Sequence, residues 1–164
     1  MTKRTLFASL AGLVAVGLGV STIANAALHF VPGAKCVVRS GPAAAYDANG
    51  QIANPGTSFQ TVICPGDTLD LATNVTSKIS VTDNSTAEQV CCSTRTRNAN
   101  NGTMNAGSNE CTSVANTGAD IFIVPPDVGP VGGTFNYHWV QCSVPPISAS
   151  GARSSVNAYR INDI

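Results

Sequence analysis

Apolar and polar residues alternate with a period of two along several stretches of the chain. In the clearest, Val75–Thr82, one side carries Val75, Ile79 and Val81, and the other carries Thr, Lys and Ser. Alternation of this kind is typical of a β-strand that buries one face. Thr134–Cys142 shows the same alternation with larger side chains. Both stretches are predicted to be strands.

The predicted strand over Thr134–Cys142 has two different faces. One face carries Phe135, Tyr137 and Trp139, and the other carries His138, Val140 and Cys142. Because His138 lies in line with Val140 and Cys142, we expect a histidine of the core or of the sheet surface rather than a general base. Further strands are predicted at Ala27–Val31, Lys35–Ser40, Ser58–Cys64, Thr68–Thr73, Ala87–Cys92, Ala119–Val124 and Ser154–Ile161.

The fold class follows from these strands and from the turn residues between them, such as Pro65-Gly66-Asp67. After residue 26 no stretch shows a sustained apolar repeat of helical period. This pattern favours an all-β fold, a Greek-key or Ig-like β-sandwich with about seven to nine short strands. We prefer the sandwich because disulfides between two sheets suit it, and the alternative is a small β-barrel.

The segment Ser93–Gly118 does not follow the strand pattern. It contains six asparagines and almost no bulky apolar residue, so it buries too little surface to offset its ordering entropy. We therefore predict a long polar surface loop at 93–118. Such loops are either binding elements or tolerated insertions. The candidate binding residues are Arg95, Arg97, Asn98, Asn101, Asn105 and Asn109.

The chain has six cysteines, at Cys36, Cys64, Cys91, Cys92, Cys111 and Cys142. An even number in an exported chain predicts disulfides, although sequence alone leaves the pairing open. Cys91 and Cys92 are adjacent, so on a strand their side chains point to opposite faces and bond different partners. The best single prediction is a bond from Cys91 or Cys92 to Cys111. No C-x-x-C occurs, and His29 and His138 are far apart, so no metal site is predicted.

The first 26 residues have the layout of a secretory signal peptide. Lys3 and Arg4 precede an uncharged run from Leu6 to Val20, and Ala24-Asn25-Ala26 supplies a cleavage motif. We expect cleavage near Ala26, which leaves residues 27–164 as a single secreted or periplasmic β domain. The apolar run is too short for a membrane span, and no second such run follows.

Charge and motifs narrow the function. The formal net charge is +0, and removal of Lys3 and Arg4 makes it about −2, which excludes the basic surface of a nucleic-acid binder. There is no G-x-S-x-G motif and no phosphate-binding glycine loop, so no cofactor is predicted.

The sequence therefore predicts a secreted, non-catalytic β domain for binding, adhesion or extracellular structure. Its expected partners are copies of itself or a cell-surface glycan. One alternative is a small secreted hydrolase that uses His138 with Asp120 or Asp127 as a base pair. Another is an inhibitor or effector that acts through the 93–118 loop.

Overall fold

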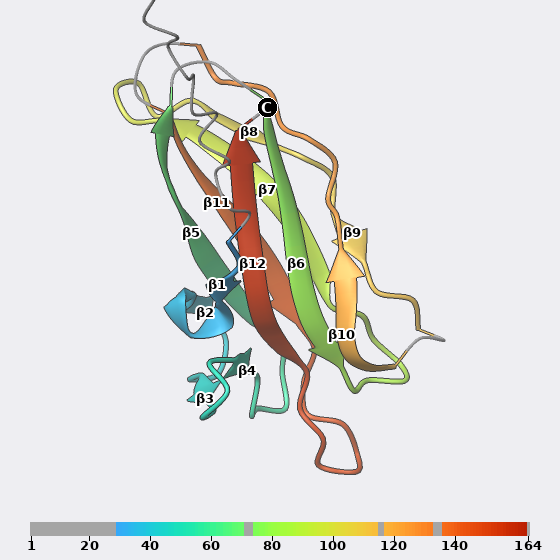
Figure 1. The fold of residues 1–164 in the computed structure, drawn as a ribbon. Coiled ribbons are helices and arrows are strands. Elements are labelled where there is room, and N and C mark those ends of the chain that lie inside the picture. The colour runs from blue at the N-terminus through green and yellow to red at the C-terminus, as the bar shows by residue number, and fades with distance from the viewer. Residues whose placement is uncertain (1–28, 71–73, 115–116, 133–135, 164) are drawn as a thin grey trace, which may run out of the picture.

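The alternating stretches form strands that pair into two antiparallel sheets of six strands each (Figure 1). The computed structural model describes residues 29–70, 74–114, 117–132 and 136–163, so the predicted signal peptide lies outside the described residues. The two sheets pack as a sandwich and do not close into a barrel. The predicted sandwich is confirmed, and the alternative of a barrel is wrong.

The first sheet, sheet A, faces the viewer in Figure 1 and has the order β10-β6-β12-β4-β3, with β1 on β12. Its strands are β1 (Val31–Pro32), β3 (Ala45–Tyr46), β4 (Ile52–Ala53), β6 (Val75–Asp83), β10 (Gly118–Ile123) and β12 (Ser155–Asp163). A short 3-10 helix, η1 (Gly33–Lys35), follows β1.

The second sheet, sheet B, has the order β2-β5-β11-β7-β8, with β9 on β7. Its strands are β2 (Val37–Ser40), β5 (Gln60–Asp70), β7 (Cys91–Asn98), β8 (Met104–Ala106), β9 (Glu110–Cys111) and β11 (Asn136–Val144). The connections β5–β6, β6–β7, β10–β11 and β11–β12 all cross between the sheets. Such crossings are typical of Greek-key sandwiches.

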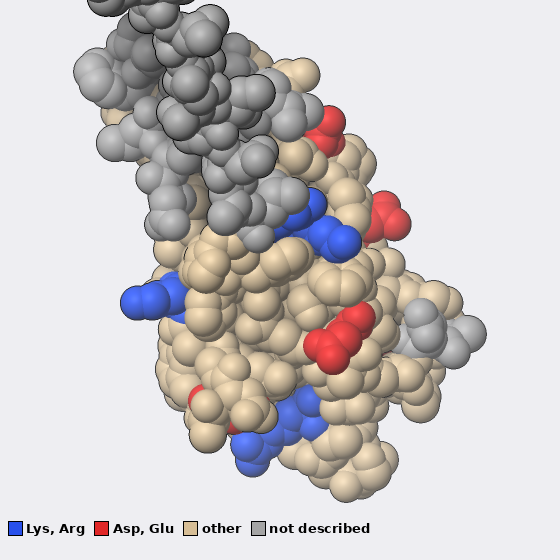
Figure 2. All heavy atoms as spheres, viewed as in Figure 1, with Lys and Arg blue, Asp and Glu red and all other residues tan. Residues whose placement is uncertain are grey.

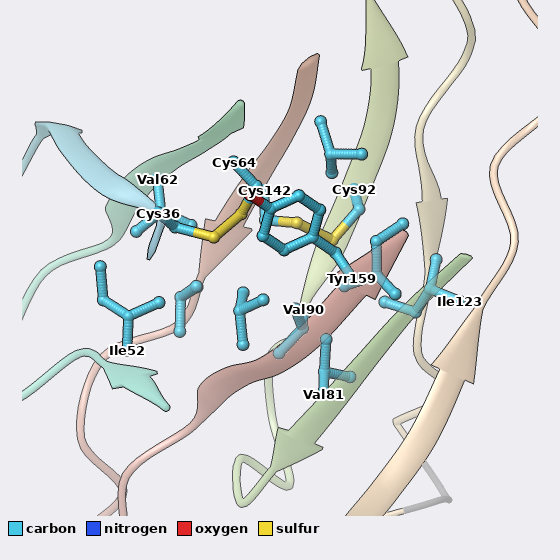
Figure 3. Close-up of a cluster of buried hydrophobic side chains, with 14 residues drawn as sticks. Cys36, Ile52, Val62, Cys64, Val81, Val90, Cys92, Ile123, Cys142 and Tyr159 are labelled. Atoms are coloured by element: carbon cyan, nitrogen blue, oxygen red, sulfur yellow. A yellow bond between two sulfur atoms is a disulfide. The ribbon is translucent and has the colours of Figure 1, made fainter. Parts of the chain in front are cut away.

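The core lies between the sheets and is built from aliphatic side chains and buried cysteines. Figure 3 shows two disulfides among valines and isoleucines, with the ring of Tyr159 from β12 beside them. On β11, Val140 and Cys142 are buried, as the alternating pattern requires, while Tyr137 on the opposite face is exposed. The strand has the two faces that its sequence predicts.

All three disulfides lie within sheet B or at its first strand. Cys92–Cys142 joins directly paired residues of β7 and β11, Cys91–Cys111 joins β7 to β9, and Cys36–Cys64 joins the residue before β2 to β5. The predicted bond from Cys91 or Cys92 to Cys111 is confirmed, with Cys91 as the partner, and so are the different partners of Cys91 and Cys92. The expected bonds between sheets are wrong, because packed sheets lie about 10 Å apart and these Cα pairs are 4.0–4.1 Å apart.

β5 runs without a turn through Pro65-Gly66-Asp67, where a turn separating two strands was expected. Trp139 pairs with Pro65 and Tyr137 with Leu69, so β5 has two more residues than β11 between these pairs. Proline and glycine fit such a bulge, since proline has no N–H for the ladder. A Cβ at Gly66 would lie 2.8 Å from the carbonyl oxygen of His138, so only glycine fits there.

The predicted loop at 93–118 is wrong for its first part, because residues 93–98 belong to β7. β8 and β9 interrupt the rest of the segment. The composition was misleading because the side chains on the inner face of β7 are polar, yet they are buried and form hydrogen bonds within the protein. Thr94 contacts Ser77 of the other sheet at 2.6 Å between hydroxyl oxygens, and Thr96 contacts Nδ1 of His138 at 2.9 Å. One hydrogen bond between the sheets (Thr94–Ser77) and one within sheet B (Thr96–His138) thus satisfy these buried polar side chains in place of apolar contacts.

Candidate functional site

The outer face of sheet B brings aromatic and cationic side chains together. Because side chains alternate along a strand, the residues of β11 and β7 that do not enter the core share this face. The register places Trp139 directly opposite Arg95, and Tyr137 directly opposite Arg97. Paired residues of this kind have neighbouring side chains. Two aromatic residues thus lie beside two arginines at the centre of the sheet.

Tyr137 and Trp139 stack on each other, with ring centroids 5.5 Å apart and an interplanar angle of 26°. Tyr137 is 36% exposed. The indole Nε1 of Trp139 is shielded from solvent and has no hydrogen-bond partner among the described residues. An unpartnered indole N–H lowers stability, and aromatic surface left in water does not contribute the stability of burial. The partial exposure of Tyr137 and the unpartnered Nε1 of Trp139 are therefore features that do not by themselves increase the stability of the fold.

A depression of about 370 Å³ lies beside the two rings, at the small end of the range for ligand pockets, roughly 300–1,000 Å³. Its lining combines the bulge of β5, the aromatic pair and side chains from the neighbouring strands: Arg39, Ile63, Pro65, Gly66, Arg97, Met104, Tyr137, His138 and Trp139. The bulge is supported from behind, because the hydroxyl of Tyr159 in sheet A donates to the carbonyl oxygen of Pro65 at 2.8 Å.

Two of the three arginines of this face donate hydrogen bonds to uncharged side chains. Nη1 of Arg39 donates to the side-chain oxygen of Gln141 at 2.9 Å, and Nε of Arg95 donates to the Ser93 hydroxyl at 3.3 Å. Arg97 lies against the turn between β7 and β8, since a Cβ at Gly102 would be 3.3 Å from its Nη2. Burial, and then the charge of Arg39, lower the pKa of Arg95.

The residues predicted for binding fall into two groups. Arg95 and Arg97 lie on the face just described, on a strand rather than on a loop. The side chains of three asparagines form hydrogen bonds with the backbone. Asn98 is buried and donates to the carbonyl oxygens of Val131 and Gly132. Asn101 accepts from the N–H of Thr103, and Asn105 donates to the carbonyl oxygen of Gly129. Asn109 is exposed. Asn98, Asn101 and Asn105 thus stabilise the backbone conformation of this segment.

Sequence reasoning missed Arg39, Tyr137 and Trp139 as candidate site residues. The alternation along 134–142 places the two aromatic residues on one face. Apolar residues occupy both faces of that stretch, so the pattern alone does not show which face is exposed. Arg39 reaches the site by its contact with Gln141, which is 102 residues away in sequence. Only the pairing of β2, β5 and β11 brings them together.

The residues of the hydrolase alternative do not form one site. His138 is 3% exposed and faces the core, where Thr96 contacts its Nδ1. Asp120 lies on β10 of the other sheet, where its carboxylate accepts from Ser80 and Asn157 at 3.5 Å. Asp127 is exposed in the segment after β10. The predicted core histidine is confirmed, and the proposed pairing with Asp120 is not formed.

The outer face of sheet A carries cations that already have partners. Nζ of Lys78 lies 4.1 Å from the ring centroid of Phe122, and the guanidinium of Arg160 lies 5.4 Å from that of Phe30. The two rings are themselves 6.2 Å apart. Figure 2, which views the molecule from this side, shows basic and acidic side chains separated by uncharged surface. Lys78 and Arg160 of this face thus each lie over an aromatic ring.

Searches for a metal site, for a membrane-spanning helix and for similar proteins add no evidence of function. Within the described ranges, no group of three or more His, Cys, Asp or Glu residues has the arrangement of a metal site. No helix in that part of the chain has the length and apolar character needed to cross a membrane. No protein-family model, curated protein or solved structure matches the chain. The three disulfides indicate an oxidising location, extracellular or periplasmic.

Proposed function

We propose that the protein is a secreted, non-catalytic binding domain and that the outer face of sheet B is its glycan-binding surface. One observation carries the proposal: the stacked side chains of Tyr137 and Trp139 border a depression on the outer face of sheet B. Sugar rings present C–H groups that pack against the negative faces of aromatic rings. An aromatic pair beside a small hollow suits one sugar unit of a longer chain.

The scaffold supports this proposal because it holds the surface rigid. The Cys92–Cys142 bond joins β7 to β11, the two strands that carry the aromatic pair and two of the arginines. Side chains held in place before binding lose less entropy when the ligand arrives. A binding surface on the disulfide-bonded sheet is thus favoured over one on a flexible segment.

The proposal is tested by binding of the purified protein to an array of neutral and acidic glycans. Trp139→Ala is expected to lower the affinity for the retained glycan by about tenfold or more, because it removes the stacking surface. The matched control is Phe122→Ala, which removes an exposed aromatic residue from the other sheet. Far-ultraviolet circular dichroism checks that both variants fold. Retention of no glycan, or equal losses in the two variants, would contradict the proposal.

Self-association is a second candidate, favoured by the edge of sheet A. β10 is the outermost strand there, and Phe122 and Val124 are 53% and 54% exposed. Edge strands with exposed apolar residues are common routes to assembly. Analytical ultracentrifugation tests this candidate: oligomers that Phe122→Lys dissociates would support it, and a monomer at all concentrations would exclude it.

A further inference from the structure

The cations of the two outer faces differ in what surrounds them. On sheet A, Lys78 and Arg160 each lie over an aromatic ring. On sheet B, Arg39 and Arg95 donate to an amide oxygen and a hydroxyl, which are uncharged acceptors. No Asp or Glu is among the described residues that line the depression. Arg39 and Arg97, which line the depression, therefore have no carboxylate beside them among its described lining residues.

From this difference we propose that the ligand of the sheet B face is an acidic glycan, whose sugar ring packs on Tyr137 and Trp139 while Arg39 and Arg97 bind its carboxylate. The inference rests on the proposed function and names the ligand class for the same surface. A guanidinium presents a planar pair of N–H donors that matches a carboxylate. Both arginines line the depression that the two rings border.

The electrostatics of the face favour an anion over a neutral sugar. Arg39 and Arg95 are close enough for the charge of Arg39 to contribute to the lowered pKa of Arg95. Two like charges near each other repel each other, and the partly buried Arg95 is in addition less well hydrated. A carboxylate bound by Arg39 and Arg97 offsets part of the positive charge of Arg39 and so weakens its repulsion of Arg95, whereas a neutral sugar leaves that repulsion unchanged.

The same features favour a glycan over other anionic ligands. A nucleic acid is bound by neutralising many phosphates, commonly six to ten or so, and this face offers Arg39, Arg95 and Arg97 on a chain with a net charge of +0. An acidic peptide carries its carboxylates on flexible side chains without a ring beside them, and so leaves the stacked aromatic pair unused. A uronic acid combines a ring and a carboxylate in one unit.

The test measures binding of the purified full protein to polygalacturonate, neutral dextran and poly-glutamate by isothermal titration calorimetry. We expect polygalacturonate to bind at least about tenfold more tightly than dextran or poly-glutamate, because it alone uses both the rings and the arginines. Arg97→Gln and Arg39→Gln should each weaken polygalacturonate binding by about tenfold. The matched control, Arg160→Gln on sheet A, should leave it unchanged. Thermal unfolding checks the fold of each variant, and Arg97→Lys should retain part of the affinity.

The alternative outcomes separate this inference from the proposed function. Equal binding of dextran and polygalacturonate, lost in Trp139→Ala, would overturn the acidic ligand and leave a glycan-binding face. Poly-glutamate that binds as tightly as polygalacturonate and is insensitive to Trp139→Ala would overturn it in favour of an acidic protein. Failure of every glycan to bind, here and on the array, would overturn the proposed function itself.

Discussion

The two outer faces of the sandwich arise in the same way from strand alternation, but the charged and aromatic side chains on them make different contacts. Each consists of the residues of alternating strands that do not enter the core. On sheet A the cations lie over Phe122 and Phe30, and Asn157 donates to the hydroxyl of Thr82 at 3.0 Å. On sheet B an aromatic pair stacks beside the arginines. The cations of sheet A lie over aromatic rings, whereas Arg39 and Arg95 of sheet B donate to uncharged side chains, and this difference is the basis of the proposed binding face.

The comparison teaches that composition does not locate a binding surface. Both faces carry an exposed aromatic residue, Phe122 on sheet A and Tyr137 on sheet B, and both carry cations. They differ in the pairing: Lys78 already lies 4.1 Å from an aromatic ring, whereas Arg97 lies over a turn. Buried polar groups without hydrogen-bond partners are exceptional in folded proteins, and Nε1 of Trp139 is one of the few such atoms among the described residues, so it favours sheet B as the face to test.

The largest expected effect comes from removing the covalent bond beneath the sheet B face. Cys92→Ala with Cys142→Ala should lower the free energy of unfolding by about 4 kcal/mol, from the loop that this bond closes. Removing Cys91–Cys111, which closes a shorter loop, should cost about 3 kcal/mol. The sequence separations are 50 and 20 residues. Urea unfolding measures both, and a smaller loss for the 92–142 pair would contradict this order.

A smaller effect is expected at the contact that joins sheet A to the floor of the depression. Tyr159→Phe removes the hydroxyl that donates to Pro65 and should lower stability by about 1 kcal/mol. Because that carbonyl belongs to the bulge, glycan affinity should fall as well. Chemical unfolding and calorimetry measure the two quantities. Lost stability with unchanged affinity would show that the bulge does not depend on Tyr159.

The smallest effect is expected on sheet A itself. Phe122→Ala removes an exposed ring and its contact with Lys78, which lowers stability by less than about 1 kcal/mol. It should leave glycan affinity unchanged, since the ring lies on the other sheet. A loss of affinity as large as that of Trp139→Ala would remove the distinction between the two faces.

Much of the fold was predictable from residues of particular kinds. The period-two pattern of Val75–Thr82 gave β6, and that of Thr134–Cys142 gave β11 over its described residues, with His138 in the core. Adjacent Cys91 and Cys92 correctly required different partners. Strand periodicity and cysteine adjacency are local properties, so one sequence suffices for them.

The parts that failed depend on contacts distant in sequence. Residues 93–98 of β7 were assigned to a loop because they include no bulky apolar residue, and the contacts of Thr94 with Ser77 and of Thr96 with His138 explain their burial. Pro65 and Gly66 predicted a turn, yet pairing with β11 makes them a bulge. The candidate site could not be predicted from the sequence for the same reason. Strand register places Arg95 and Arg97 opposite the aromatic residues, and register is not encoded by the alternation alone.

The most direct test uses the fluorescence of Trp139, the single tryptophan of the chain. Titration of the unmodified protein with polygalacturonate should change the emission of this residue in a saturable way, with the same affinity as calorimetry reports. The change should persist in Phe122→Ala and weaken in Arg97→Gln. Binding that calorimetry detects at saturation while the tryptophan emission stays constant would place the ligand elsewhere and contradict the assignment of the sheet B face.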